Sequence, residues 1–174
     1  MGSVSVALPV KLIMGIIFCD VSDFKAIKKR LQKKFGIIDY ETEEIDFSGT
    51  SYYEKEFGVD LKKKFFSFKR LFKLQASYKI KLFTNDLERK FTRNRTRLVN
   101  IDPGYVSLAK LVLFTTKNHS HRIYLDRGIY ASLDLRFKKN SFVPVEWTYP
   151  DYRQRAYIDF FNTVRKTYAA QLKH

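Results

Sequence analysis

The most apolar stretch of the chain, Val10–Cys19, is continuous and of strand length. A run without alternation is typical of a strand that is buried on both faces. Asp20 and Ser22 follow it with side-chain oxygens suited to a helix N-cap, and apolar residues then recur at helical spacing as far as Gly36. The pattern therefore predicts a central strand followed by an amphipathic helix over 22–35.

The rest of the first half continues this alternation of strand and helix. Alternating apolar and polar residues predict a second strand over 37–47, which gives a β-α-β opening of the split, ferredoxin-like kind. A loop is expected around Gly58. A strand is expected over 62–71, and apolar residues three and four apart predict a helix over 77–91.

The second half is dominated by strand patterns. A short strand, Leu98–Ile101, is expected to close at Asp102-Pro103-Gly104, which is strong turn chemistry, and 108–115 favours another strand. Alternation over 121–138 predicts a hairpin whose Ile129, Ala131, Leu133, Leu135 and Phe137 share one face. Thr148 is expected to cap a final helix with a buried apolar stripe.

These elements place the chain in the α+β class. We expect a single domain over residues 1–174, with a mostly antiparallel sheet, the ferredoxin-like opening, and about three helices packed on the sheet. The stretch from Val4 to Cys19 contains Pro9 and Lys11, is too short to span a bilayer, and lacks the order of regions found in a signal peptide. With its single cysteine, the sequence favours a cytoplasmic protein without a membrane partner.

Charge changes this picture because it is concentrated. The chain has 33 Lys and Arg against 18 Asp and Glu, and residues 61–140 alone hold 20 against 5. The basic clusters, interleaved with phenylalanines, are Lys62, Lys63 and Lys64, then Arg93, Arg95 and Arg97, and finally residues 136–139. Cations neutralise phosphate and aromatic rings stack on bases, so this composition favours a nucleic-acid partner. The plainer interpretation is a half-buried strand with phenylalanine inside and lysine in water.

Several enzyme classes are excluded by missing motifs. The chain has neither a Gly-x-x-x-x-Gly-Lys-Ser/Thr loop nor a Gly-x-Gly-x-x-Gly turn, so it has no P-loop and no Rossmann phosphate cradle. Its lone Cys19 excludes a cysteine-rich zinc site, and it lacks a Gly-x-Ser-x-Gly elbow. His119-Ser120-His121 occurs once, whereas a two-histidine phosphodiesterase needs such a motif twice.

Polar residues crowd the segment between Asn100 and Tyr130. Within it His121 is a candidate acid or base, and Asp102 would orient a histidine or bind a divalent ion. Lys117 and Arg122 are candidates for holding phosphate oxygens. The alternatives are ligand contact without chemistry and an ordinary polar hairpin loop. No metal or cofactor is assigned, because the pair of histidines has no identified third ligand.

Several segments also resemble the prokaryotic family called domain of unknown function 4416. They are PVKLIMG (9–15), VNIDPGY (99–105), Thr116-Lys117, HRI (121–123), GIYA (128–131) and WTYPDY (147–152). The resemblance covers nearly the whole chain. It implies a single-domain protein of thermophilic or anaerobic bacteria, and it supplies no mechanism and no catalytic residue. Some members carry an automated label of GTP-binding protein, and without a P-loop such binding would be of another kind.

Three hypotheses about function follow. The first is a binding module in which segments 62–73, 89–97 and 136–139 form one positive face for RNA or another polyanion. The second is an enzyme that acts on a nucleotide or phosphorylated metabolite around residues 102–130. The third is a subunit that docks an acidic protein; no pattern in the sequence indicates an oligomeric state.

Overall fold

The computed structural model describes residues 2–47, 60–93 and 96–173. Within them nine strands form one antiparallel sheet in the order β11-β10-β8-β7-β1-β4-β2, with β3 beside β4 and β9 beside β10. The strands are β1 (Val10–Phe18), β2 (Ile38–Glu41), β3 (Ile45–Asp46), β4 (Lys62–Phe72), β7 (Val99–Val106), β8 (Lys110–Thr115), β9 (Arg122–Asp126), β10 (Ile129–Lys138) and β11 (Ser141–Pro144). A separate two-stranded hairpin joins β5 (Thr92–Arg93) to β6 (Thr96–Arg97).

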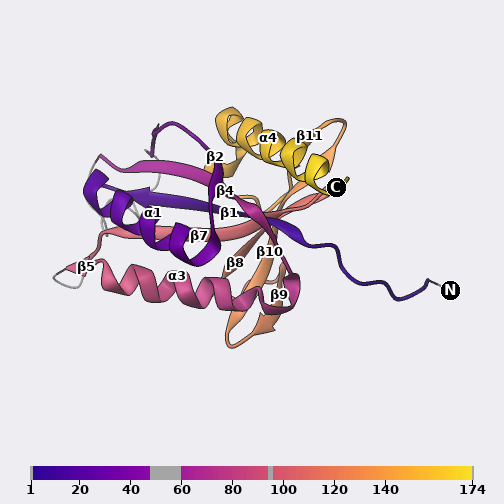
Figure 1. Cartoon of the computed structure of the whole chain (residues 1–174), viewed down its shortest axis with the longest axis horizontal. Helices are drawn as coiled ribbons and strands as arrows, with labels where there is room; N and C mark the ends of the chain where they lie inside the picture. Colours follow the sequence, from indigo (N-terminus) through magenta and orange to yellow (C-terminus); the bar gives the residue numbers. More distant parts are fainter. Residues whose placement is uncertain (1, 48–59, 94–95, 174) are drawn as a thin grey trace.

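Helices cover both faces of the sheet. They are α1 (Val21–Phe35), α3 (Tyr78–Lys90) and α4 (Arg155–Gln171), with short 3₁₀ turns η1 (Leu74–Ala76) and η2 (Asp151–Arg153). Figure 1 shows α1 and α3 on one side of the sheet and α4 on the other. The expected α+β class, with a mostly antiparallel sheet and three helices among the described residues, is confirmed.

The N-terminal unit forms as its sequence predicts. β1 is buried along its whole length, between β4 and β7 at the centre of the sheet. Asp20 caps α1 by accepting a hydrogen bond from the backbone of Ser22, and Gly36 ends the helix with φ of 100°. β4 lies between β1 and β2 and is antiparallel to both, so β1 and β2 run parallel. This is the split β-α-β arrangement.

The predicted strand over 37–47 is divided in the structure. β2 ends at Glu41 and β3 begins at Ile45, and both pair with β4. Just after β2 the hydroxyl of Thr42 accepts from the backbone amide of Phe65, where the ladder is interrupted. The predicted loop around Gly58 lies outside the described residues.

The Asp102-Pro103-Gly104 turn was a wrong prediction, because β7 passes straight through these residues. All three pair with β1, opposite Gly15, Met14 and Ile13. On its other edge β7 pairs with β8 only from Gly104 onward. The amide and the carbonyl of Ile101 bond side chains of α3, so they lie on the edge of β7 that faces away from β1. Backbone groups of residues two apart in a strand lie on the same edge. Pro103, two residues on, therefore faces β8, where it offers no N–H. The two strands separate at this point.

The prediction that alternate residues of 129–137 share one face was also wrong. A bulge between Leu133 and Leu135 inserts one extra residue, Asp134, into β10. Ile129 and Leu133 pack in the core beneath α1 and α3, whereas Leu135 and Phe137 pack in the core beneath α4. A bulge moves the following side chains to the opposite face.

The expected cap of the last helix is placed differently. α4 begins at Arg155, and its N-cap residue Gln154 makes no side-chain capping bond. Thr148 instead bonds the backbone of the loop and of β10: its hydroxyl accepts from the amide of Val145 and donates to the carbonyl of Asp134. Local propensity was overridden because this hydroxyl anchors the bulge. Among the described residues, no helix combines the length and apolar character that a membrane crossing requires.

Candidate functional site

A cavity of about 470 Å³ opens where β7 and β8 separate. It lies on the part of the α4 face that α4 leaves uncovered, and it extends through the gap to side chains of α3. Ile17, Asn100 and Asp102 approach it from β1 and β7, Thr115 and Arg122 from β8 and β9, and residues 149–154 from the segment before α4. The cavity lies here because β7 and β8 do not pair before Gly104, and Pro103 has no N–H with which to extend their pairing.

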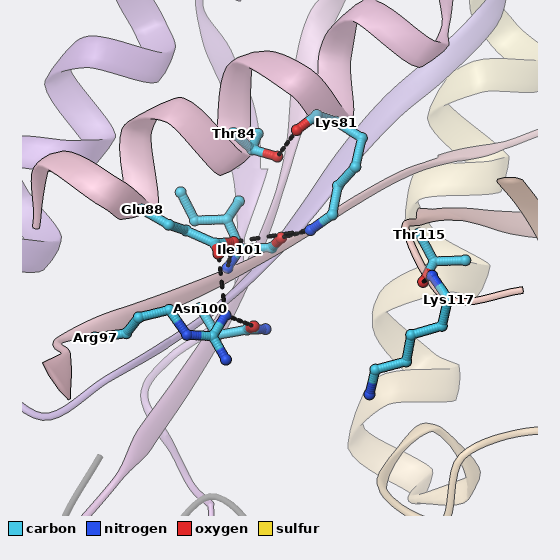
Figure 2. A network of polar contacts seen from close by, with 8 residues as sticks. All are labelled: Lys81, Thr84, Glu88, Arg97, Asn100, Ile101, Thr115 and Lys117. Atoms are coloured by element: carbon cyan, nitrogen blue, oxygen red, sulfur yellow. Dashed lines mark hydrogen bonds and ion pairs between the residues drawn. The ribbon is translucent and has the colours of Figure 1, made fainter. Parts of the chain in front are cut away.

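Side chains of α3 satisfy the backbone edge that β8 leaves free. Lys81 donates to the carbonyl of Ile101 at 2.8 Å, and the amide of Ile101 donates to Glu88 at 2.8 Å. Arg97 then donates to the other oxygen of Glu88 at 3.2 Å and approaches Asn100. Figure 2 shows this network, with Thr115 and Lys117 lying apart from it. Burial raises the pKa of Glu88, and the charge of Lys81 partly opposes that shift.

Arg122 is the most constrained cation of the cavity. It lies at the start of β9 and is nine-tenths buried. Its Nη1 donates to the carbonyl of Lys117 at 3.0 Å and to the hydroxyl of Thr115, while Nη2 donates to the hydroxyl of Tyr149 at 2.7 Å. These bonds fix the plane of the guanidinium, yet its buried Nε has no hydrogen-bond partner among the described residues.

Asp134, the extra residue of the β10 bulge, is a buried acid of the cavity. Its side chain is 1% exposed, and neither carboxyl oxygen has a hydrogen-bond partner within the described part of the chain. Burial raises the pKa of Asp134 to about 7; the nearby hydroxyl of Ser132 and the charge of Arg122 partly oppose that rise. A carboxyl group in this state exchanges protons near neutral pH.

Lys63 lies at the inner wall among aromatic rings. It is 1% exposed and forms an ion pair of 2.6 Å with Asp151. Its ammonium also lies 4.5 Å from the ring centre of Tyr152 and 5.1 Å from that of Phe65. Cation–π contacts of this kind compensate for lost hydration. Lys63 is therefore part of the cavity wall, with its charge largely balanced.

Unpartnered polar groups gather in this cavity. Buried side-chain atoms without a hydrogen-bond partner, among the residues the structure describes, belong to Asn100, Arg122, Ser132, Asp134, Tyr152 and Tyr157. All except Tyr157 line the cavity. Buried polar atoms are nearly always paired in native proteins, so such a concentration indicates a place where ligand or water supplies the bonds.

The sequence-predicted site residues are partly brought together. Asp102, Lys117, Arg122, Lys63 and Arg97 line the cavity. The other candidates that the structure describes lie outside it. His121 stacks on Trp147 with ring centres 5.0 Å apart, and partial burial lowers its pKa. Lys62 forms an ion pair with Asp46, and Arg93 lies 3.5 Å from Asp23. Lys64 lies over the ring of Phe24, and Arg95 falls outside the described residues.

The basic segments grouped in the sequence are spread over both ends of the sheet, because 62–73 itself runs along β1 from Phe18 to Val10. Lys62 pairs with Phe18 at the end of β1, as does Val99. Arg136 pairs with Lys110, next to the pair formed by Leu111 and Val106, at the other end of the sheet. Carboxylates from the flanking segments, Asp46 and Asp151, balance part of the charge of 62–64. Among the described residues, no group of three or more His, Cys, Asp or Glu side chains is arranged to hold a metal ion.

The family model described as Domain of unknown function (DUF4416) matches residues 8–168. The chain belongs to this DUF4416 family. The match includes every strand of the sheet and every residue that lines the cavity. The comparisons with curated proteins and with solved structures find no match. The DUF4416 fold and its site must therefore be interpreted from the chemistry of the side chains.

Sequence reasoning missed the most informative residues of the site. Asp134 and Ser132 occupy the polar positions of an alternating strand, which is typical of a water-exposed face, and the bulge that buries Asp134 has no sequence marker. Lys81 stood in a helix rich in lysine and gave no signal of burial. The one available clue was proximity: Asp102, Thr115, Lys117 and Arg122, within the polar segment 100–130, all line the cavity.

Proposed function

We propose that the cavity between β7 and β8 binds a small phosphorylated ligand, a nucleotide or phosphorylated metabolite. The observation that carries this proposal is the buried guanidinium of Arg122, held by three hydrogen bonds while its Nε has no partner in the described chain. A fixed guanidinium with an unused N–H binds an oxyanion without first losing side-chain entropy. Pockets for small ligands commonly have volumes of about 300–1,000 Å³.

The charge balance of the cavity supports an anionic ligand. Lys63, Lys81, Arg97, Lys117 and Arg122 contribute five cations, against the four carboxyl groups of Glu88, Asp102, Asp134 and Asp151. Because burial raises the pKa of Asp134 to about 7, that carboxyl is only partly ionised at neutral pH. The cavity is therefore net positive, by one to two charges. A phosphate group would be attracted to it.

A reaction on the bound ligand would use Asp134 rather than His121 for proton transfer. Asp134 lines the cavity and has a pKa near neutral pH, which suits a general acid or base. His121 stacks between His119 and Trp147, away from the lining residues. Asp102, the second catalytic candidate of the sequence analysis, lines the cavity and remains part of this proposal.

The test is calorimetric titration with inorganic phosphate, pyrophosphate and nucleotides, with and without Mg²⁺. Arg122→Gln should weaken binding about 10- to 100-fold, since hydrogen bonds to charged groups contribute roughly 1.5–3 kcal/mol. Arg136→Gln makes the same change at an exposed position on β10, outside the cavity, and should leave affinity unchanged. His121→Ala should also leave affinity within about twofold by the same reasoning. Absence of binding by every ligand, or equal affinity in Arg122→Gln, would contradict the proposal.

We propose nucleic-acid binding as a second candidate function, located in the groove between α1 and α3. This groove has a volume of about 370 Å³ and is lined by Arg30, Lys33, Lys34 and Lys90 around Phe83. Asp86 also lines it, but its carboxylate forms an ion pair with Arg89. Arg30, Lys33 and Lys34 lie outside the basic segment 61–140, and the groove brings them together with Lys90 from within it. Single-stranded RNA has the charge and the bases to match such a surface.

Filter binding of a single-stranded RNA tests this second function. The double variant Lys33→Gln with Lys34→Gln should weaken binding and reduce its salt dependence. Lys138→Gln with Lys139→Gln removes the same charge from the β10–β11 turn and serves as the matched control. If only the control pair reduces binding, the positive face proposed from the sequence is favoured over the groove. An RNA affinity that does not change with salt concentration would contradict both the groove and the positive face as binding sites.

A further inference from the structure

The carboxyl group of Asp134 has two unpartnered oxygens in one buried position. The bulge fixes its backbone, because the hydroxyl of Thr148 donates to the carbonyl of Asp134. Arg122 lies close enough to lower the pKa of Asp134, yet it forms no hydrogen bond with the carboxyl and keeps its own Nε unused. Two groups of opposite charge thus face the same cavity without bonding each other. Both side chains line the cavity, so one ligand could bond both.

A carboxylate with two free oxygens accepts two hydrogen bonds from donors that lie side by side. Cationic donors are disfavoured here, since Arg122 and Lys63 already line the cavity. Neutral donors remain, and two hydroxyl groups on adjacent carbons present such a pair. Ser132 and Asn100 supply further unpartnered groups beside the acid, a hydroxyl and an amide nitrogen, which suit the oxygens of the same hydroxyl groups.

We propose that the ligand carries a vicinal diol, with Arg122 binding its phosphate and Asp134 accepting hydrogen bonds from its two hydroxyls. The substrate class is therefore a sugar phosphate or a ribonucleotide rather than a simple phosphate ester. This inference rests on the proposed function of the cavity, because the phosphate at Arg122 places the diol within reach of Asp134. Hydrogen bonds donated by the ligand also favour the ionised form of the Asp134 carboxyl group. This form predominates above neutral pH, where binding should be favoured.

The test compares two sugars that differ by one hydroxyl. Ribose 5-phosphate, 2-deoxyribose 5-phosphate and inorganic phosphate are titrated into the full chain at a pH of about 8, where Asp134 is mostly ionised. The ribose compound should bind about tenfold or more tightly than the deoxy compound, because the deoxy compound leaves a buried charged acceptor unpaired. Equal affinities for the two sugars would overturn the diol while leaving the phosphate site intact.

Asp134→Asn provides the matched variant, since it keeps the shape of the side chain and removes the charge and one acceptor oxygen. In this variant the affinities for the two sugars should come within about threefold of each other, while inorganic phosphate binds as well as before or better. Asp126→Asn makes the same change in the β9–β10 turn, outside the cavity, and should preserve the discrimination. Binding of inorganic phosphate without either sugar would also overturn the diol. Failure of all three ligands would instead overturn the proposed function.

Discussion

Two buried polar clusters lie on the α4 face of the same sheet, and they differ in how their hydrogen bonds are satisfied. Beside β1, β2 and β4 the fully buried Lys11 bonds Asp39 and the amide oxygen of Gln171, and Ser67 donates to the other oxygen of Asp39. Beside β7 and β10, Asn100, Ser132, Asp134 and Tyr152 have buried atoms without partners among the described residues. The first cluster has its hydrogen bonds within the chain, whereas the second has polar atoms that the described part of the chain leaves unbonded.

Hydrogen bonding, rather than burial or charge, distinguishes the two polar clusters. Burial and charge are similar in the two clusters, since Lys11 and Asp134 are both at most 1% exposed. They differ only in whether their polar atoms have hydrogen-bond partners. A buried polar group costs free energy unless it is bonded, so the cavity cluster is retained at a cost to stability, as binding sites often are.

The largest expected effect is on the complete cluster. Lys11→Met should lower the free energy of unfolding by about 3–5 kcal/mol, because it leaves Asp39 as a largely buried charge without its counterion. Chemical denaturation at neutral pH measures this loss. Adding Asp39→Asn should restore part of it, since the uncompensated charge is then gone. A single variant as stable as the wild type would show that the cluster is not a stabilising unit.

The next effect has the opposite sign and depends on pH. The pKa of Asp134 is about 7 in the folded chain, above its ordinary value of 3.8. The unfolded state then binds fewer protons, so stability falls as pH rises from about 4 to 7 and stays level above that range. Asp134→Asn should match the wild type near pH 4 and exceed it at pH 8 by up to about 4 kcal/mol. Denaturation curves across this range decide; a variant that is less stable at pH 8 would refute the assignment.

A smaller effect is expected where β7 and β8 meet. A Cβ atom at Gly104 would lie 2.4 Å from the carbonyl oxygen of Val112, so the strands must move apart. Gly104→Ala should cost about 1–3 kcal/mol, as overpacking usually does, and it should change phosphate affinity because the cavity begins at this position. Thermal unfolding and titration measure the two consequences. Gly2→Ala, at an open position, is the control.

The smallest effect tests the unpartnered cluster directly. Ser132→Ala removes a buried hydroxyl that has no hydrogen-bond partner in the described structure. At a pH of about 4, where Asp134 is protonated, the free energy of unfolding should therefore change by less than about 0.5 kcal/mol or increase slightly. Ser67→Ala removes an equally buried hydroxyl that donates to Asp39 at 2.7 Å and should cost more, about 1 kcal/mol. Equal costs for the two serines would erase the distinction between the clusters.

Local patterns predicted much of this fold. The continuous apolar run of β1, the Asp20 cap and Gly36 are local signals, and each corresponds to what the structure contains. The failures arise where distant partners decide. Asp102-Pro103-Gly104 has turn chemistry, but pairing with β1 along the whole of β7 outweighs it. The alternation of β10 is likewise interrupted by a bulge that only its pairing with β8 reveals.

The candidate site was predictable only in part for the same reason. Arg122, Lys117 and Asp102 belong to a segment whose polar composition stands out, so sequence reasoning selected them. Asp134 and Lys63 are polar residues in strands whose pattern is equally consistent with exposure to water. Their burial depends on the bulge and on the aromatic rings of the segment before α4, and neither is a local property of the sequence.

The absent amide hydrogen of Pro103 has a lasting consequence for the cavity. A sheet that opens by breaking hydrogen bonds can close again, and its entrance would then exist only part of the time. Here Pro103, opposite Phe114 of β8, has no N–H to donate. The gap between β7 and β8 is therefore a consequence of the covalent structure of one residue. A ligand of the proposed kind would therefore reach this part of the DUF4416 domain without any separation of paired strands.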